Sequence, residues 1–155
     1  MIFVATGTTG FDALATEIDR LAPTLCEDIV VQIGNGQYTP QQAEYFRFKP
    51  SLEPYYEQAS LVIAHGGLGI CIEVLEHGKP LIGLSNPDRY DQHQKDLLST
   101  LATQNYLVWC HELSGLAEAI MQARQTTFRQ YTKPECVIHL QIKSFLDNLA
   151  HSKSS

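Results

Sequence analysis

The stretch "VIAHGGLGICIEVLEHGKP", residues 62–80, joins an apolar run to a helical pattern through a cluster of glycines. The apolar run predicts a buried strand that ends at His65. Apolar residues then recur at helical spacing from Leu68 to His77, and Gly78 is well placed to end that helix. A strand that enters a helix through glycines is typical of a parallel α/β sheet.

The same alternation of apolar runs and helical patterns covers the rest of the chain. The predicted strands are residues 2–5, 28–33, 45–48, 61–64, 80–84 and 106–109. The predicted helices are residues 11–22 (ending before Pro23), 52–59, 68–77, 90–104, 113–123 and 135–150. This pattern predicts an α/β, Rossmann-like, mostly parallel sheet with helices on both faces. Right-handed crossovers place every strand-to-helix loop at one edge of such a sheet, where ligands bind.

The size and composition of the chain indicate one globular domain. It has 155 residues, of which 44% are hydrophobic and 18% are charged. We expect residues 1–150 to form a single domain and residues 151–155, "HSKSS", to be a flexible tail.

Charge and cysteine content narrow the class of protein. The net charge of −6 and the scattered Lys and Arg residues argue against a nucleic-acid-binding protein. The four cysteines form no C-x-x-C pair, which predicts reduced thiols in the cytoplasm. No signal-peptide pattern and no apolar run of about 20 residues is present, so we expect a soluble chain that needs a partner to reach a membrane.

Two glycine-rich loops are expected at the ligand-binding edge, Thr6–Gly10 and His65–Gly69. Glycines let a backbone approach a ligand closely, and the helix that follows offers unpaired N–H groups and a positive dipole end. Such loops suit a phosphate group, although glycines can also serve only to make a tight turn. No G-x-x-x-x-G-K-[ST] string occurs, and "TGTTGFD" lacks the G-x-G-x-x-G of dinucleotide sites.

The stretch after residue 64, "HGGLGICIEVLEHGKP", resembles the nucleotide-sugar signature of GT-B glycosyltransferases, in particular those of family 28. His65, Gly67, Glu73, Gly78 and Pro80 match its spacing. With the opening "IFVATGTTGFDAL", the chain is most similar to the small donor-binding subunits of two-chain, polyprenyl-linked enzymes of this family. The resemblance implies one half of a GT-B fold and covers about residues 1–110.

The resemblance also implies roles for individual residues. Glu73 would accept hydrogen bonds from the ribose hydroxyls of uridine diphosphate (UDP), and Phe48 and Lys49 would lie beside the uracil. The donor diphosphate would be bound by Thr8, Thr9, His65, Gly66, Gly67 and Gly69. The donor sugar would be bound by Asp91, His93 and Gln94, of which Gln94 fits best. Ile70 departs from the family, in which many members place a phosphate-binding Ser at this position.

Each of these residues also has a purely structural interpretation. Glu73 alone could favour a helix dipole, His65 could be a hydrogen-bonded structural residue, and "DQHQK" could be a polar helix start. Cys71 is expected to be a packing residue.

The resemblance implies an enzyme, a UDP-sugar-dependent hexosyltransferase, that works with a membrane-anchored, acceptor-binding subunit and a polyprenyl-linked acceptor. The general base would lie on that partner, with His93 as the candidate on this chain. We expect no cofactor and no metal, and a location at the inner face of the membrane in polysaccharide or glycan biosynthesis. Two alternatives stay open: a non-catalytic nucleotide-sugar-binding module, and a flavodoxin-like domain that binds flavin mononucleotide.

An apolar stripe in the predicted last helix consists of Ile138, Ile142, Phe145 and Leu149. This stripe is expected either to pack on its own domain or to contact the partner.

Overall fold

The structure, a computed structural model, describes residues 1–87, 93–133, 142, 143 and 145. Within these residues, six parallel strands form one sheet in the order β3-β2-β1-β4-β5-β6. The strands are β1 Ile2–Ala5, β2 Ile29–Gln32, β3 Glu44–Phe46, β4 Leu61–His65, β5 Leu81–Leu84 and β6 Val108–Trp109. The predicted Rossmann-like parallel sheet is thereby confirmed.

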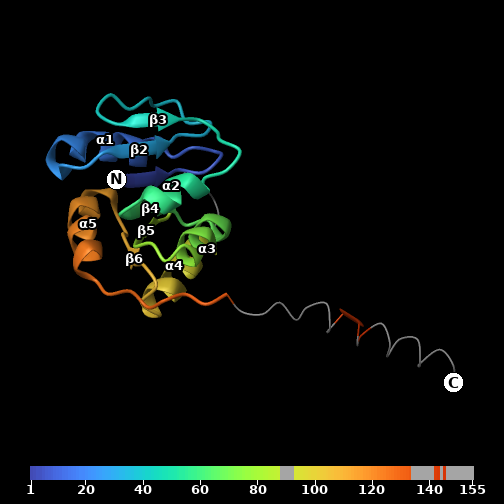
Figure 1. Cartoon of the computed structure of the whole chain (residues 1–155). Coiled ribbons are helices and arrows are strands. Elements are labelled where there is room, and N and C mark those ends of the chain that lie inside the picture. Colours follow the sequence, from blue (N-terminus) through green and yellow to red (C-terminus); the bar gives the residue numbers. More distant parts are fainter. Residues whose placement is uncertain (88–92, 134–141, 144, 146–155) are drawn as a thin grey trace, which may run out of the picture.

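Helices cover both faces of the sheet (Figure 1). They are α1 Asp12–Leu25, α2 Glu53–Gln58, α3 Leu68–Glu76, α4 His93–Thr103, the 3-10 turn η1 Leu113–Gly115 and α5 Leu116–Gln125. One core cluster joins the sheet to α1 and α5, and the other joins it to α2, α3 and α4. The alternation of side chains along each strand fills both clusters, which explains why the strands read as continuous apolar runs.

The prediction that the first helix ends before Pro23 was wrong, since α1 continues to Leu25. A proline removes one helical hydrogen bond and crowds the turn before it, which costs least near the end of a helix. Leu25 packs against the first core cluster, and the Thr24 hydroxyl donates to the Leu21 carbonyl at 2.7 Å. The packing of this last turn therefore stabilises the helix by more than the proline destabilises it.

Other boundaries differ by a few residues. The predicted strand 45–48 is β3, Glu44–Phe46, because the Arg47 side chain turns to donate to the carbonyls of Gly34 and Gly36. The predicted helix 113–123 is η1 followed by α5, which ends at Gln125. The predicted helix 135–150 falls largely outside the described residues.

The loop between β2 and β3 is held against α1 by two aspartates. The Asp12 carboxylate accepts hydrogen bonds from the backbone N–H groups of Gln37 and Tyr38 at 3.0 to 3.2 Å. Asp19, only 5% exposed, accepts from the backbone N–H groups of Gln41 and Gln42 and from the Tyr38 hydroxyl. The loop leaves the carboxyl edge after β2 and returns to the start of β3, so Asp12 holds its first part and Asp19 holds its last part against α1.

Residues 126–133, which we call the strap, run along the opposite, amino edge of the sheet after α5 (Figure 1). The Arg129 N–H donates to the Asn105 carbonyl at 2.9 Å, and the Tyr131 ring meets the Tyr106 ring edge-on at 5.6 Å. Lys133 pairs with Glu76 of α3 at 2.7 Å. The strap therefore carries the chain from the α5 face to the α3 face.

No helix among the described residues has the length and apolar character required to cross a membrane.

Candidate functional site

A cleft of about 330 Å³ lies at the carboxyl edge of the sheet, where three strand-to-helix connections meet. It is lined by Thr8, Thr9, His65, Gly66, Gly67, Leu68, His93, Gln94 and Leu97. These residues come from the loop after β1, the turn between β4 and α3, and the first turns of α4. The cleft thus forms at the edge that the parallel topology predicts for a ligand.

His65, the last residue of β4, lies between the two glycine-rich loops. A Cβ atom on Gly7 would stand 2.5 Å from Cε1 of the His65 ring, and one on Gly67 would stand 2.5 Å from its Nε2. Gly7 also has a φ of +79°, which side chains rarely adopt. The His65 Nδ1 lies 3.4 Å from the Ala5 carbonyl oxygen. The imidazole is therefore held in place by backbone on both sides at the wall of the cleft.

The amides of the β4–α3 turn divide into two groups. The Gly66 N–H donates to the Leu84 carbonyl, and the Gly67 N–H donates to the His65 carbonyl, each at 2.7 Å. The first helical hydrogen bond of α3 runs from the Cys71 N–H to the Gly67 carbonyl. The N–H groups of residues 68–70 precede that bond, so they are the ones that a helix start offers to an anion. Gly66 and Gly67 accordingly shape the turn, and the amide donors fall one to four residues later.

The α4 side of the cleft is held by a buried amide pair. Gln94 is 8% exposed, and its Oε1 accepts from the backbone N–H of Asn86 at 3.0 Å. The Asn86 side chain in turn donates to the Gly10 carbonyl at 3.2 Å. The loop after β5, the start of α4 and the loop after β1 are thereby tied together around the cleft.

Glu73 lies on α3, outside the cleft lining, and its side chain is exposed. Its Oε2 accepts a hydrogen bond from the Tyr56 hydroxyl at 3.0 Å. Tyr56 lies on α2 and is 1% exposed. Burial, and then the nearby Glu73 carboxylate, raise the pKa of Tyr56, so its hydroxyl keeps its proton and donates.

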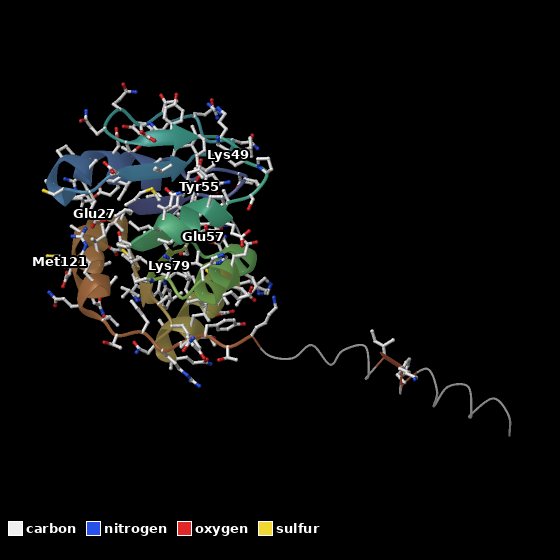
Figure 2. All side chains as sticks on the ribbon, in the orientation of Figure 1. Glu27, Lys49, Tyr55, Glu57, Lys79 and Met121 are labelled. Atoms are coloured by element: carbon white, nitrogen blue, oxygen red, sulfur yellow. The ribbon has the colours of Figure 1, made fainter. Side chains whose placement is uncertain are left out.

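The predicted uracil neighbours lie before α2. Phe48 is 51% exposed, and the Lys49 ammonium lies 5.7 Å from the centroid of the Phe46 ring. Figure 2 shows Lys49 beside Tyr55, with Glu57 further along the same side of the molecule. Tyr55 packs on Phe46 with ring centroids 4.7 Å apart.

The structure brings seven of the predicted residues together at the cleft. They are Thr8, Thr9, His65, Gly66, Gly67, His93 and Gln94. Gly69 is exposed in the first turn of α3, and Glu73, Phe48 and Lys49 lie outside the lining. Asp91 lies outside the described residues.

The sequence analysis missed Leu68, Leu97 and Asn86. The first two line the cleft with apolar surface, and Leu68 is 61% exposed. Asn86 could have been noticed as the polar residue that follows a buried strand at the ligand-binding edge.

One cysteine lies beneath the turn between β4 and α3. Cys71 is fully buried beneath the turn, and burial raises the pKa of its thiol to about 12, which fits the predicted packing role. Cys26, Cys71 and Cys110 are free thiols. No cluster of three His, Cys, Asp or Glu side chains that could hold a metal occurs in the part of the chain that the structure describes.

The chain is similar in sequence to known proteins. The family model "Glycosyltransferase family 28 C-terminal domain" matches residues 1–149. Over 122 residues, the chain is 32% identical to the UDP-N-acetylglucosamine transferase subunit ALG13 of Homo sapiens, a match that covers 70% of this chain. The chain spans only 11% of the length of that relative and 10% of its Mus musculus counterpart.

Solved structures share the fold at lower identity. The crystal structure of Acinetobacter baumannii MurG superimposes with a TM-score of 0.61 and 20% identity, over 82% of this chain and 45% of that one. An NMR structure of ALG13 superimposes with a TM-score of 0.61 and 17% identity, over 86% of this chain and 90% of that one. At these identities the likeness concerns the fold.

Proposed function

The chain belongs to the glycosyltransferase family 28 C-terminal domain family, and from this premise we propose that it binds a UDP-sugar and provides the donor half of a glycosyltransferase. The observation that carries the proposal is the cleft in which the His65 ring, held between two glycine-rich loops, lies next to the start of α3. UDP-N-acetylglucosamine is the first donor to test, because the human relative is named for its transfer.

The chemistry of the cleft fits a diphosphate leaving group. When the bond between the sugar and the diphosphate breaks, negative charge builds up on the phosphate oxygen. The N–H groups of residues 68–70, the α3 dipole and the His65 imidazole are fixed donors that would stabilise this charge. Thr8 and Thr9 would close the other side of the diphosphate, facing it or the acceptor.

The donor sugar would lie toward α4. His93 and Gln94 line the cleft there, and Asp91 is proposed to act beside them. Glu73 would hold the ribose, and Phe48 and Lys49 the uracil, on the α2 side of α3.

The acceptor half is proposed to come from a second, membrane-anchored chain with a polyprenyl-linked acceptor. That partner would supply the general base and would hold this chain at the inner face of the membrane, in polysaccharide or glycan biosynthesis. On this chain, His93 lines the cleft and is the candidate for the general base. We propose that transfer needs no metal or other cofactor, because the donors named above can balance the diphosphate charge.

Calorimetry on the full chain tests the donor site. We expect UDP and UDP-N-acetylglucosamine to bind. Glu73→Ala should weaken the affinity for both by about 10- to 100-fold, because it removes hydrogen bonds between the ribose hydroxyls and a carboxylate. Glu57→Ala is the matched control, since it removes an exposed carboxylate from α2. The proposal is wrong if the folded wild-type chain takes up no uridine nucleotide, alone or with its partner.

A non-catalytic nucleotide-sugar-binding module would show the same calorimetry, and only turnover separates the two. Flavin mononucleotide serves as a negative ligand in the same titration. Saturable binding of the flavin in place of UDP would favour the flavodoxin-like alternative.

A further inference from the structure

The side chain that would hold the ribose is itself held by a residue from another helix. Glu73 projects from α3 with an exposed carboxylate, while Tyr56 on α2 is buried and donates its hydroxyl to the Glu73 Oε2 at 3.0 Å. An exposed glutamate on a helix samples several rotamers in water. A hydrogen bond from a fixed donor selects one of them.

The phenol is a fixed donor because its ring is enclosed. The Tyr56 ring packs against Phe3 of β1 at 5.7 Å and against His77 at 5.4 Å between centroids. The short helix that carries it is itself anchored, since the Lys79 ammonium donates to the carbonyls of Glu57 and Ala59 at 2.7 and 3.2 Å.

The helix that carries Glu73 is joined to the same unit. The His77 Nδ1 donates to the Glu73 carbonyl at 2.8 Å, and the His77 Nε2 lies 3.8 Å from the Glu53 carboxylate on α2. His77 therefore links the main chain at Glu73 to the helix that carries Tyr56, while the Tyr56 hydroxyl contacts the Glu73 carboxylate.

We propose that Tyr56 is a positioning residue for nucleoside recognition: its hydroxyl orients the Glu73 carboxylate so that the free oxygen and remaining lone pairs meet the two ribose hydroxyls. This inference rests on the proposed function, and it adds a residue that would touch no ligand atom. A carboxylate oriented before binding loses less conformational freedom when the ribose arrives, so the affinity for ribose-bearing ligands is higher.

The test compares ligands with and without the ribose hydroxyls. Tyr56→Phe keeps the ring between Phe3 and His77 and removes only the hydroxyl, and Glu73 stays in contact with water. We expect the full chain carrying Tyr56→Phe to bind UDP about 5- to 10-fold more weakly than wild type, and 2′,3′-dideoxy-UDP equally well. Tyr55→Phe, a matched loss of a hydroxyl from the same helix, should leave both affinities unchanged.

A double substitution separates positioning from stability. In a Glu73→Ala background, Tyr56→Phe should no longer alter the ratio of the two affinities, because the side chain that accepts its hydrogen bond is gone. This comparison still tests the positioning role if Tyr56→Phe lowers the melting temperature.

Three results would overturn the inference while leaving the donor site standing: equal weakening of both ligands, no weakening of either, or a wild-type chain that does not distinguish the two ligands. Absence of UDP binding to the wild-type chain would instead remove the proposed function on which the inference rests.

Discussion

Asp19 shows how a single buried carboxylate holds the loop between β2 and β3. Burial opposes its ionisation, but hydrogen bonds from the Gln41 and Gln42 amides and the Tyr38 hydroxyl outweigh burial and lower the pKa of Asp19. A carboxyl with a lowered pKa stabilises the fold at pH values above its unfolded pKa of about 3.9. The stabilisation disappears as the pH falls through the lower, folded value.

We therefore predict that Asp19→Asn lowers the free energy of unfolding by about 1–3 kcal/mol at pH 7. The difference from wild type should shrink as the pH falls from about 4 through the lower, folded pKa, because the wild-type carboxyl becomes protonated first in the unfolded and then in the folded chain. Urea denaturation at a series of pH values measures both effects. The exposed Asp28→Asn serves as the control, and a difference for Asp19→Asn that does not change with pH would contradict the electrostatic explanation.

For single residues, the sequence predicts which side chains belong to the site better than it predicts which groups they form hydrogen bonds with. The two glycine-rich loops with Thr8 and His65 could be placed at one edge because the ends of parallel strands meet there, whereas Gln94 was assigned through the family resemblance. The tyrosine behind Glu73 and the asparagine behind Gln94 could not be found, because each contact joins side chains whose separation depends on how two elements pack. Likewise, the hydrogen bonds of Gly66 and Gly67 follow from the conformation of the turn.

Among the elements, the strap contributes stability without regular secondary structure. It covers Tyr106 with the Tyr131 ring and places the Arg129 guanidinium 5.3 Å from the Tyr106 ring centroid. The Asn105 side chain donates to the Thr127 carbonyl at 3.0 Å.

We predict that a chain ending at residue 125 is less stable than one ending at residue 133 by about 2–4 kcal/mol, since it exposes Tyr106 and loses these hydrogen bonds. Urea denaturation of the two shortened chains gives the difference directly, with no contribution from residues beyond 133. Equal free energies of unfolding for the two shortened chains would mean that the strap does not stabilise the fold.

Element types could be predicted where a run was strongly apolar or periodic, and boundaries could not. The strands β1 and β4 coincide with their predicted runs to within one residue, because four or more apolar residues in succession fit only a buried strand here. The predicted end of α1 was wrong because the packing of Leu25 stabilises the last turn by more than Pro23 destabilises it. No local sequence pattern indicates that packing.

For the whole molecule, the proposed function makes the sheet the donor half of a two-part enzyme. The cleft opens at the edge of that single sheet. The apolar stripe proposed for partner contact has two described members, Ile142 and Phe145, which are 53% and 63% exposed.

We predict that transfer from UDP-N-acetylglucosamine to a polyprenyl-diphosphate acceptor appears only when the chain is mixed with its acceptor-binding partner. Transfer should persist in excess EDTA, because fixed amides and His65, rather than a metal, would balance the diphosphate charge. A radiolabelled sugar assay measures the product, and Glu73→Ala should form less of it at a donor concentration below saturation. Tight UDP binding without product in the complete mixture would favour the non-catalytic module, and loss of product on adding EDTA would contradict the metal-free mechanism.

The strap has a practical consequence, because its contact with Asn105 lies on the side of the sheet where β1 begins. Met1 precedes β1, and Arg129 of the strap is bonded to Asn105 just before β6, so both lie across the sheet from the cleft. A sensor surface or fluorescent label joined through residue 1 or through the exposed residue 130 would leave the cleft facing the solution. Immobilised titrations with nucleotides should then give the same affinities from either attachment point.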